Sequence, residues 1–294
     1  MSQSAPWKTS LHGGHSGEFC EHAVGSLREV VDSALAKGFE VYGVSEHAPR
    51  AEERFLYPSE RAKGYTLERI HDEFEAYAKA VRALAEEYAD RMTLLCGFEA
   101  EVVPSGRYRD LMRGHRARHG FDYMVGSVHY VGEVSIDGER ADFDRAVEGC
   151  GGLEPFAVRY YNDVAEMIEA LEPDVVGHLD LIRKNAPADA DLATPAIRAA
   201  ANRALEAARA SGAVLDLNTA GWRKGLGSPY PAPWLVRRAH EAGVAFCFGD
   251  DSHGPDQTGA GVVEARDYLL ENGVGAIRRL TRRDGAIQWE TVAL

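Results

Sequence analysis

Apolar positions along this chain fall into two alternating patterns, one with the period of an amphipathic helix and one with the character of a short buried strand. Five apolar residues between Leu27 and Leu35 recur at helical spacing, after Ser26 as a plausible N-cap and before Gly38 as a plausible stop. A short apolar run follows at residues 41–45. The same unit recurs, with helices predicted at residues 71–88, 155–171, 194–211 and 233–242, each followed by an apolar run.

Strands of this kind can be counted near residues 8, 42, 95, 124, 176, 215 and 246. Strands that alternate with helices imply a parallel sheet with right-handed crossovers. We therefore predict an α/β fold whose strands form a closed or nearly closed barrel, with an open doubly wound sheet as the alternative. Residues 51–66 and 133–154 are too long for tight connections and are placed as loops over the mouth of the barrel. Because no low-complexity linker interrupts the pattern, residues 1–294 are expected to form a single domain.

Side chains that bind metals follow these strands. The candidates at the strand ends are His47, Glu99, His129, His178, Asp251 and His253. Three more histidines, His12, His15 and His22, lie in a glycine-containing loop just after the first strand. The carboxyl ends of the strands share one mouth in a parallel barrel, so these groups are expected to converge there. Imidazole and carboxylate are ligands of Zn, Mn and Fe, and the pattern therefore predicts a metal site at that mouth.

The composition limits the partners of such a site. A formal net charge of −13 and a pI near 5.3 disfavour nucleic acid, because phosphate backbones bind basic surfaces. Cys20, Cys96, Cys150 and Cys247 are scattered without a CxxC pair, which favours the reducing cytoplasm. We find no run of about 18 apolar residues and no leader-like N-terminus, so no membrane partner is expected. A small-molecule phosphate ester and inorganic phosphate fit better, and the sequence leaves the oligomeric state open.

Short segments carry the candidate ligands in a fixed order. They are His15-Ser16-Gly17, Ser45-Glu46-His47-Ala48-Pro49, Gly97-Phe98-Glu99, Gly126-Ser127-Val128-His129, Gly177-His178-Leu179-Asp180, Asn218-Thr219-Ala220 and Asp251-Ser252-His253. Together they resemble the ordered motifs of the polymerase and histidinol phosphatase (PHP) superfamily, most closely its histidinol-phosphatase branch. The resemblance runs from about residue 12 to about residue 261. It implies a distorted (β/α)7 TIM-like barrel that holds three divalent metal ions, which could be Zn, Mn or Fe, at the carboxyl ends of its strands.

The resemblance also implies how the ligands divide among the three ions. The first ion would take His12, His15, Glu99 and Asp251. The second would take Glu99, His129 and His178, so that Glu99 bridges the pair, and the third would take His22, His47 and His253. The chain departs from the family where the usual His-x-His becomes His12-Gly13-Gly14-His15. His12 can therefore be a ligand only if the glycine pair bulges.

Further residues are expected to act on the substrate. The expected catalytic residues are Glu99, Asp251, His253 and Asp180, and the expected substrate contacts are Arg223, Asn218, Ser127 and Asp137. Asp180 would either orient a ligand or protonate the leaving group. Arg223 follows the sixth strand, where barrels often bind phosphate, although it could be a surface arginine. Asp137 could meet the ammonium or imidazole group of the substrate, or could be a solvated loop acid.

The activity that the resemblance implies is hydrolysis of L-histidinol phosphate to L-histidinol and phosphate in histidine biosynthesis. Two neighbouring divalent ions lower the pKa of a shared water, and further positive charge offsets the charge of the phosphoryl oxygens. One alternative is a PHP-superfamily phosphoesterase that acts on nucleotides or nucleic-acid ends. The other is a non-catalytic metal-binding PHP domain, although such domains usually lack ligands that this chain retains.

Overall fold

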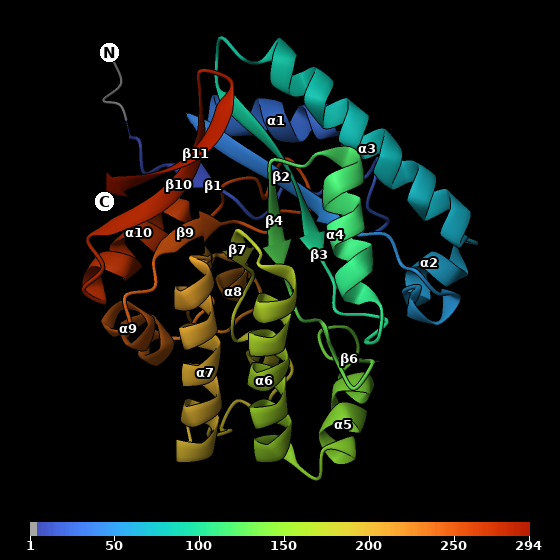
Figure 1. The fold of residues 1–294 in the computed structure, drawn as a ribbon, viewed down its shortest axis with the longest axis vertical. Coiled ribbons are helices and arrows are strands. Elements are labelled where there is room, and N and C mark those ends of the chain that lie inside the picture. Colours follow the sequence, from blue (N-terminus) through green and yellow to red (C-terminus); the bar gives the residue numbers. More distant parts are fainter. Residues whose placement is uncertain (1–4) are drawn as a thin grey trace.

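Seven parallel strands form a nearly closed barrel at the centre of the computed structural model, which describes residues 5–294 (Figure 1). In the order in which they pair, they are β1 (Thr9–Ser10), β2 (Val41–His47), β3 (Thr93–Ala100), β4 (Tyr123–Gly126), β7 (Val175–Val176), β8 (Val214–Asn218) and β9 (Phe246–Gly249). The Leu11 amide donates to the Phe248 carbonyl at 2.8 Å, which joins the first strand to the last. The predicted barrel is confirmed, and the open doubly wound sheet is not formed.

A tyrosine fills the interior of the barrel between two glycines. A Cβ atom on Gly43 would lie 2.4 Å from the Tyr123 hydroxyl oxygen, and one on Gly97 would lie 2.3 Å from the Tyr123 ring. The close approach requires glycine at both positions. The packing holds β2 and β3 close around Tyr123, and these are the two strands that carry His47 and Glu99.

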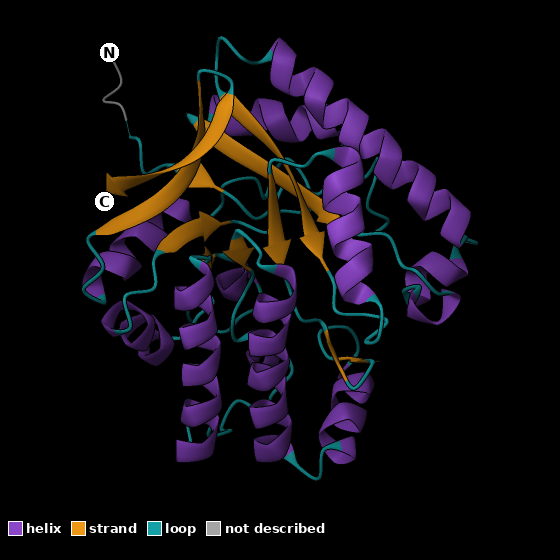
Figure 2. Cartoon of the chain, in the orientation of Figure 1, coloured by secondary structure: helices purple, strands orange, loops and turns teal. Residues whose placement is uncertain are grey.

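Helices cover the outside of the barrel, as Figure 2 shows in purple. The main ones are α1 (Leu27–Ala36), α3 (Leu67–Glu87), α4 (Tyr108–His119), α6 (Leu153–Leu171), α7 (Pro195–Ser211), α9 (Pro233–Glu241) and α10 (Val262–Glu271). Ser26 caps α1 in a capping box with Glu29, and Thr194 caps α7 ahead of Pro195, as the sequence indicates. None of the helices in the described part of the chain has the length and apolarity of a membrane span.

The segments expected to be loops over the mouth contain short elements instead. They hold η1 (Glu53–Phe55), α2 (Pro58–Ala62), β6 (Val134–Ser135) and α5 (Arg140–Gly149), with β5 (Tyr130–Val131) pairing to β6. Two more short helices, η2 (Leu181–Lys184) and α8 (Ala220–Arg223), follow β7 and β8. Pro58 starts α2 and Glu60 bonds back to the Tyr57 amide, while α5 buries Phe143 and Ala146. The signals for these elements are too short to be read from periodicity, but residues of both segments do line the mouth.

A C-terminal hairpin, β10 (Ala276–Arg283) paired with β11 (Ala286–Ala293), was not expected from the sequence. Its Leu280 packs with Leu11, Val41 and other residues of the barrel interior, at the end opposite the strand termini that carry the candidate ligands. Most positions of β10 are arginine or exposed, so the alternation of apolar residues is weak. The hairpin closes the amino end of the barrel and leaves the carboxyl end for the site.

Candidate metal centre

The nine residues expected to bind metal lie together at the carboxyl ends of the barrel strands. They are His12, His15, His22, His47, Glu99, His129, His178, Asp251 and His253. The register of the sheet explains part of this, because His47 pairs with Glu99 across β2 and β3. Ligand atoms of eight of the nine residues fall into groups whose members lie within 4.8 Å of one another, and His22 is outside these groups.

The glycine pair between His12 and His15 brings both rings to this centre. The Gly13 amide donates to Ser45 Oγ at 3.1 Å, and the Gly14 amide donates to Ser252 Oγ at 3.0 Å. Gly14 has φ +77°, and a Cβ atom there would lie 2.5 Å from a Val44 methyl group. His12 and His15 are both fully buried. The extra glycine is thus accommodated as a bulge, and the condition for His12 to face the centre is met.

Glu99 lies between four imidazole rings. Its Oε1 is 3.2 Å from the Nε2 atoms of both His12 and His178 and 3.4 Å from that of His129, while its Oε2 is 2.8 Å from His47 Nδ1. Glu99 belongs to two close groups, one with His12 and His15 and the other with His129 and His178. This placement fits a carboxylate that bridges two cations.

Asp251 completes the centre from the opposite side of the barrel. It forms a third close group with His12 and His178, and its Oδ1 lies 3.8 Å from His15 Nε2. Asp251 has φ +46° and His178 has φ +20°, conformations that non-glycine residues adopt rarely. Such strain persists where the surroundings hold a residue in place, and it is frequent at functional sites.

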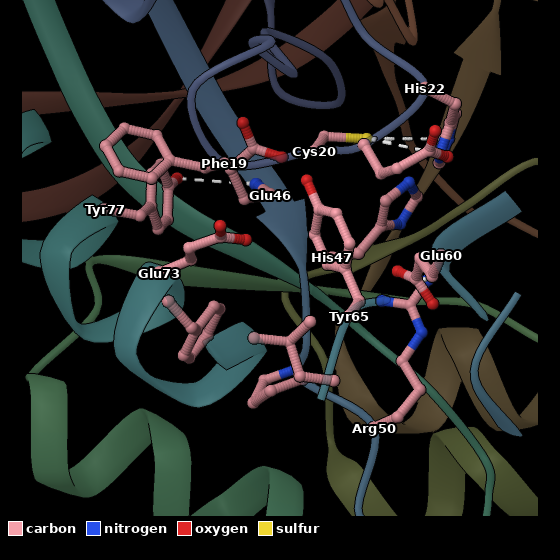
Figure 3. A pocket seen from close by; sticks show the side chains of 14 residues that line it. Phe19, Cys20, His22, Glu46, His47, Arg50, Glu60, Tyr65, Glu73 and Tyr77 are labelled. Carbon is pink, nitrogen blue, oxygen red and sulfur yellow. Dashed lines mark hydrogen bonds and ion pairs between the residues drawn. The ribbon is translucent and has the colours of Figure 1, made fainter. Parts of the chain in front are cut away.

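The fourth close group differs from the third set of ligands that the resemblance implies. It contains His47 and His253 as expected, but its other members are His15 and Cys20. His22 is exposed and lies beside the group, with its Nδ1 3.4 Å from Cys20 Sγ and its ring centroid 4.8 Å from that of His253. Figure 3 shows the Cys20 sulfur beside the His22 ring, with the His47 ring nearby.

Three carboxylates, of which Asp216 and Glu46 are buried and Glu101 is partly buried, fix the orientation of the rings, and the sequence did not single them out as partners. Asp216 Oδ2 lies 2.7 Å from His12 Nδ1, Glu101 Oε2 lies 2.8 Å from His129 Nδ1, and Glu46 Oε2 lies 3.2 Å from His15 Nδ1. A carboxylate on one ring nitrogen holds the proton there and leaves the other nitrogen as an acceptor. In each pair the free nitrogen is Nε2.

The charges around the centre favour cations. Burial lowers the pKa of His12, but the charges of Glu99 and Asp216 outweigh burial and raise that pKa well above its usual value. Burial also lowers the pKa of His129, but the charges of Glu101 and Glu99 outweigh burial and raise that pKa to about 10. A field that stabilises a proton on these rings also stabilises a metal ion in its place.

A metal cluster fits the donors that the structure presents. The Nε2 atoms of His12, His15 and His47 and the Nδ1 atom of His178 are buried without a hydrogen-bond partner in the described part of the chain. Unpaired buried nitrogens are costly unless a cation or water engages them. Imidazole and carboxylate donors in close groups of three or four match the coordination of Zn, Mn or Fe.

A cavity of about 800 Å³ opens over the centre. Its floor includes His47, Glu99, His129, His178 and Asp251, and its walls come from the mouth segments. The lining above the floor carries both charges: its basic side chains are Arg54, Arg61, Arg145, Lys184, Arg223 and Lys224, and its acidic ones are Glu133, Asp137, Glu139 and Asp142. Arg54, Arg145 and Lys184 pair with Glu133, Asp142 and Asp137. The other three basic side chains form no ion pair with the residues that the structure describes, so they are the ones that suit an anionic small molecule.

Two of the residues expected to touch substrate lie on the wall of this cavity. Asp137 lines the cavity, with its Oδ2 3.6 Å from Lys184 Nζ. Arg223 also lines it, while its Nη2 donates to the carbonyl oxygens of Asp250 and Asp251, the latter at 2.8 Å. Arg223 is therefore both on the rim and bound to the backbone beside Asp251.

The other two lie behind the ligands. Ser127 is buried and donates to Glu99 Oε1, and Asn218 is buried and donates to Asp216 Oδ2 at 2.8 Å. Neither is among the residues that line the cavity. Both hold carboxylates in place, because each is a donor to an acid of the centre.

Asp180 is also removed from the cavity wall. Its Oδ2 accepts from the Ala232 amide at 2.8 Å and from Arg183 Nη1 at 3.3 Å. These contacts fix the turn after His178. The geometry favours the orienting role that was expected for Asp180 over protonation of the leaving group.

Asp216, Glu101 and Cys20 are the residues that sequence reasoning missed, and two of them left a signal. Asp216 is a charged residue inside the apolar run of β8, and Glu101 follows Glu99 by two positions, on the same side of the chain. Cys20 lies beside presumed ligands in the sequence, but we interpreted it as a small buried apolar residue, and it is buried in the structure.

Comparisons with known proteins agree with this geometry. Residues 12–220 match the PHP domain family. The chain is 32% identical to a probable histidinol-phosphatase of Schizosaccharomyces pombe over 267 residues. This alignment covers 90% of this chain and 86% of that protein. A solved structure of a putative histidinol phosphatase from Listeria monocytogenes has a TM-score of 0.75 at 26% identity, covering 87% of this chain and 99% of that one. The histidinol phosphate phosphatase of Lactococcus lactis, solved with zinc, L-histidinol and phosphate, has the same fold, with a TM-score of 0.70 at 20% identity over 96% of this chain and 99% of that one.

Proposed function

The chain belongs to the PHP domain family, and on that premise we propose that it hydrolyses L-histidinol phosphate to L-histidinol and inorganic phosphate. The observation that carries the proposal is Glu99, which joins two close groups of ligands at the floor of a cavity that Arg223 and Lys224 also line. The relatives described as histidinol-phosphatases over nearly the whole chain support the substrate. The neighbour that binds zinc, L-histidinol and phosphate supports the same ligands here.

We propose three divalent ions at this centre, which could be Zn, Mn or Fe. Their chemistry would be to lower the pKa of a bound water and to offset the charge of the phosphoryl group. Glu99 would hold two of the ions, with His12 and His15 on one side and His129 and His178 on the other. The third would lie near His47 and His253.

The residues of the chain supply orientation and charge around the phosphate. Burial raises the pKa of Asp251, but the charges of His12 and His253 outweigh burial and lower it below its usual range, so that the group is a carboxylate. At the cavity floor this carboxylate would supply negative charge to a metal ion beside His12 and His178. Arg223 and the two lysines of the rim would hold the phosphoryl oxygens through charged hydrogen bonds.

We assign recognition of the histidinol group to Asp137. Its carboxylate faces the cavity from the segment after β6 and is only partly screened by Lys184. An ammonium or imidazolium group of the substrate would pair with it. We propose a single domain for residues 1–294, in the cytoplasm, where its free cysteines would stay reduced.

The proposal is tested by hydrolysis and selectivity in one preparation. The purified protein should contain transition metal by elemental analysis and release phosphate from L-histidinol phosphate. Asp137→Asn should raise KM for L-histidinol phosphate but leave hydrolysis of phenyl phosphate unchanged, because phenyl phosphate has no cationic group. Metal without hydrolysis of either ester would support a non-catalytic metal-binding domain and contradict the proposal.

A further inference from the structure

Tyr57 lies on the wall of the substrate cavity, in the mouth segment at residues 51–66. It is one of the residues that line the cavity, as are His22 and Asp137. Tyr57 is the N-cap of α2, but its side chain makes no capping hydrogen bond. Its hydroxyl group is therefore not committed to the helix that follows it.

A largely buried cation holds the Tyr57 ring in place. The Arg50 guanidinium carbon lies 3.9 Å from the centroid of the Tyr57 ring. Arg50 Nη2 lies 3.3 Å from Glu60 Oε1, and Glu60 Oε2 accepts from the Tyr57 amide at 2.7 Å. Figure 3 shows the Arg50 guanidinium beside Glu60. The three residues fix one another, so little conformational entropy of Tyr57 is lost when a ligand binds.

Asp137 faces the same part of the cavity as Tyr57. Burial raises the pKa of Tyr57 well above its usual value, the charge of Arg50 opposes the rise, and the charge of Asp137 adds to it. The hydroxyl group is thus protonated at neutral pH and near enough to Asp137 for that charge to act on it. A protonated hydroxyl can accept a hydrogen bond from an N–H group and can donate its own proton to a carboxylate or an imidazole nitrogen.

The substrate offers more polar groups than Asp137 alone can engage. L-Histidinol phosphate carries an ammonium group and an imidazole ring, and both have N–H donors. The Asp137 carboxylate already lies 3.6 Å from Lys184 Nζ. A tyrosine beside it supplies an apolar face and a hydrogen-bonding tip together, which suits a ligand that is both aromatic and cationic.

We propose that Tyr57 is a specificity-determining residue, whose hydroxyl group binds the N–H groups of the substrate together with Asp137. Arg50 and Glu60 are positioning residues, because neither is among the residues that line the cavity and both act through Tyr57. The proposal rests on the proposed function and names a further part of the same site.

The test compares two phosphate esters on the metal-replete protein, with phenyl phosphate as the internal reference because it has no N–H group. Tyr57→Phe keeps the ring and its contact with Arg50 but removes the hydroxyl group. The ratio of kcat/KM for L-histidinol phosphate to that for phenyl phosphate should fall by about tenfold, mainly through KM. Tyr65→Phe is the matched control and should keep the ratio. Tyr65 belongs to the same mouth segment and has the Arg69 guanidinium carbon 3.7 Å from its ring centroid, but it is not among the residues that line the cavity.

Arg50→Met tests the positioning role. It should lower the same ratio, and adding Tyr57→Phe to it should have little further effect, because both changes act through one hydroxyl group. An unchanged ratio in Tyr57→Phe, or an equal fall in Tyr65→Phe, overturns the proposal. Full additivity in the double variant overturns the positioning role. Tyr57→Phe alone decides the question if Arg50→Met fails to fold.

Calorimetry of L-histidinol binding in the presence of phosphate separates this inference from the proposed function. Binding that weakens by about tenfold in Tyr57→Phe, in a protein that does not hydrolyse L-histidinol phosphate, contradicts the function and leaves the Tyr57 assignment standing. Hydrolysis with the same ratio in wild type and Tyr57→Phe contradicts only the assignment. Wild type that binds no L-histidinol overturns both.

Discussion

Asp216→Asn should weaken metal binding without changing any residue that faces the substrate. Asp216 is fully buried, and its Oδ2 lies 2.7 Å from His12 Nδ1. The charge fixes the proton on Nδ1 and strengthens Nε2 as a donor to the cation. Asparagine keeps the size but removes the charge, and it can turn an amide group towards the ring. The His12 ring would then lose both its fixed tautomer and part of its basicity.

The expected loss can be given a magnitude. Removing a carboxylate that orients a metal-binding imidazole weakens affinity by about 10- to 100-fold, which corresponds to about 1.4 to 2.7 kcal/mol. At a fixed excess of free metal, the metal-dependent part of the free energy of unfolding should fall by the same amount. The metal-free protein gives the reference against which this part is measured.

The assay is a competition titration with a chromogenic chelator, together with unfolding with and without metal. Asp174→Asn is the control, because Asp174 also accepts a backbone amide hydrogen bond, from Met124, but lies at the start of β7, away from the centre. His12→Ala should lose one ion, and adding Asp216→Asn to it should have little further effect. Unchanged affinity in Asp216→Asn, or full additivity in the double variant, would refute the reasoning.

Three further predictions address the centre and its rim. Glu99→Gln should keep its circular dichroism spectrum but lose more than about tenfold in turnover, a barrier change above about 1.4 kcal/mol, because an amide cannot bridge two cations. Arg223→Ala should raise KM for histidinol phosphate and weaken competitive inhibition by phosphate at constant metal content, and Arg223→Lys should recover part of the loss. Loss of metal without a change in phosphate inhibition would mean that Arg223 acts only through its contacts with the backbone. Metal affinity should fall as pH falls, by up to about tenfold per pH unit for each proton released. The reason is that His12 and His129 have raised pKa values and must lose protons to bind a cation. Calorimetry that detects no proton release on metal binding would contradict this prediction.

The sequence was sufficient to predict the barrel because most of its strands keep an apolar run and most of its main helices keep an apolar spacing, with α1 and α7 also keeping the expected caps. Prediction from the sequence failed where an element is short or where charged residues interrupt its alternation of apolar positions. The helix α2 has five residues, and the arginines of β10 hide the alternation around Leu280. Elements of this size are formed by contacts with the rest of the molecule and not by their own periodicity.

The grouping of the candidate ligands followed from one physical rule, that parallel strands end at one mouth. The finer arrangement depends on backbone geometry that spacing does not encode. The bulge at Gly14 brings His12 inward, and the turns around Cys20 place its sulfur where the resemblance puts His22. Asn218 and Ser127 lie behind acids of the centre for the same reason, since a motif identifies a residue but not the direction of its side chain.

Steady-state kinetics with a panel of phosphate esters tests the central claim most directly. The values of kcat/KM for L-histidinol phosphate, mononucleotides and sugar phosphates should be measured on the metal-replete protein. We predict that L-histidinol phosphate is preferred by more than about tenfold, a transition-state difference above about 1.4 kcal/mol. A mononucleotide turned over as fast or faster would contradict the assignment and support a nucleotide phosphoesterase on the same metal centre.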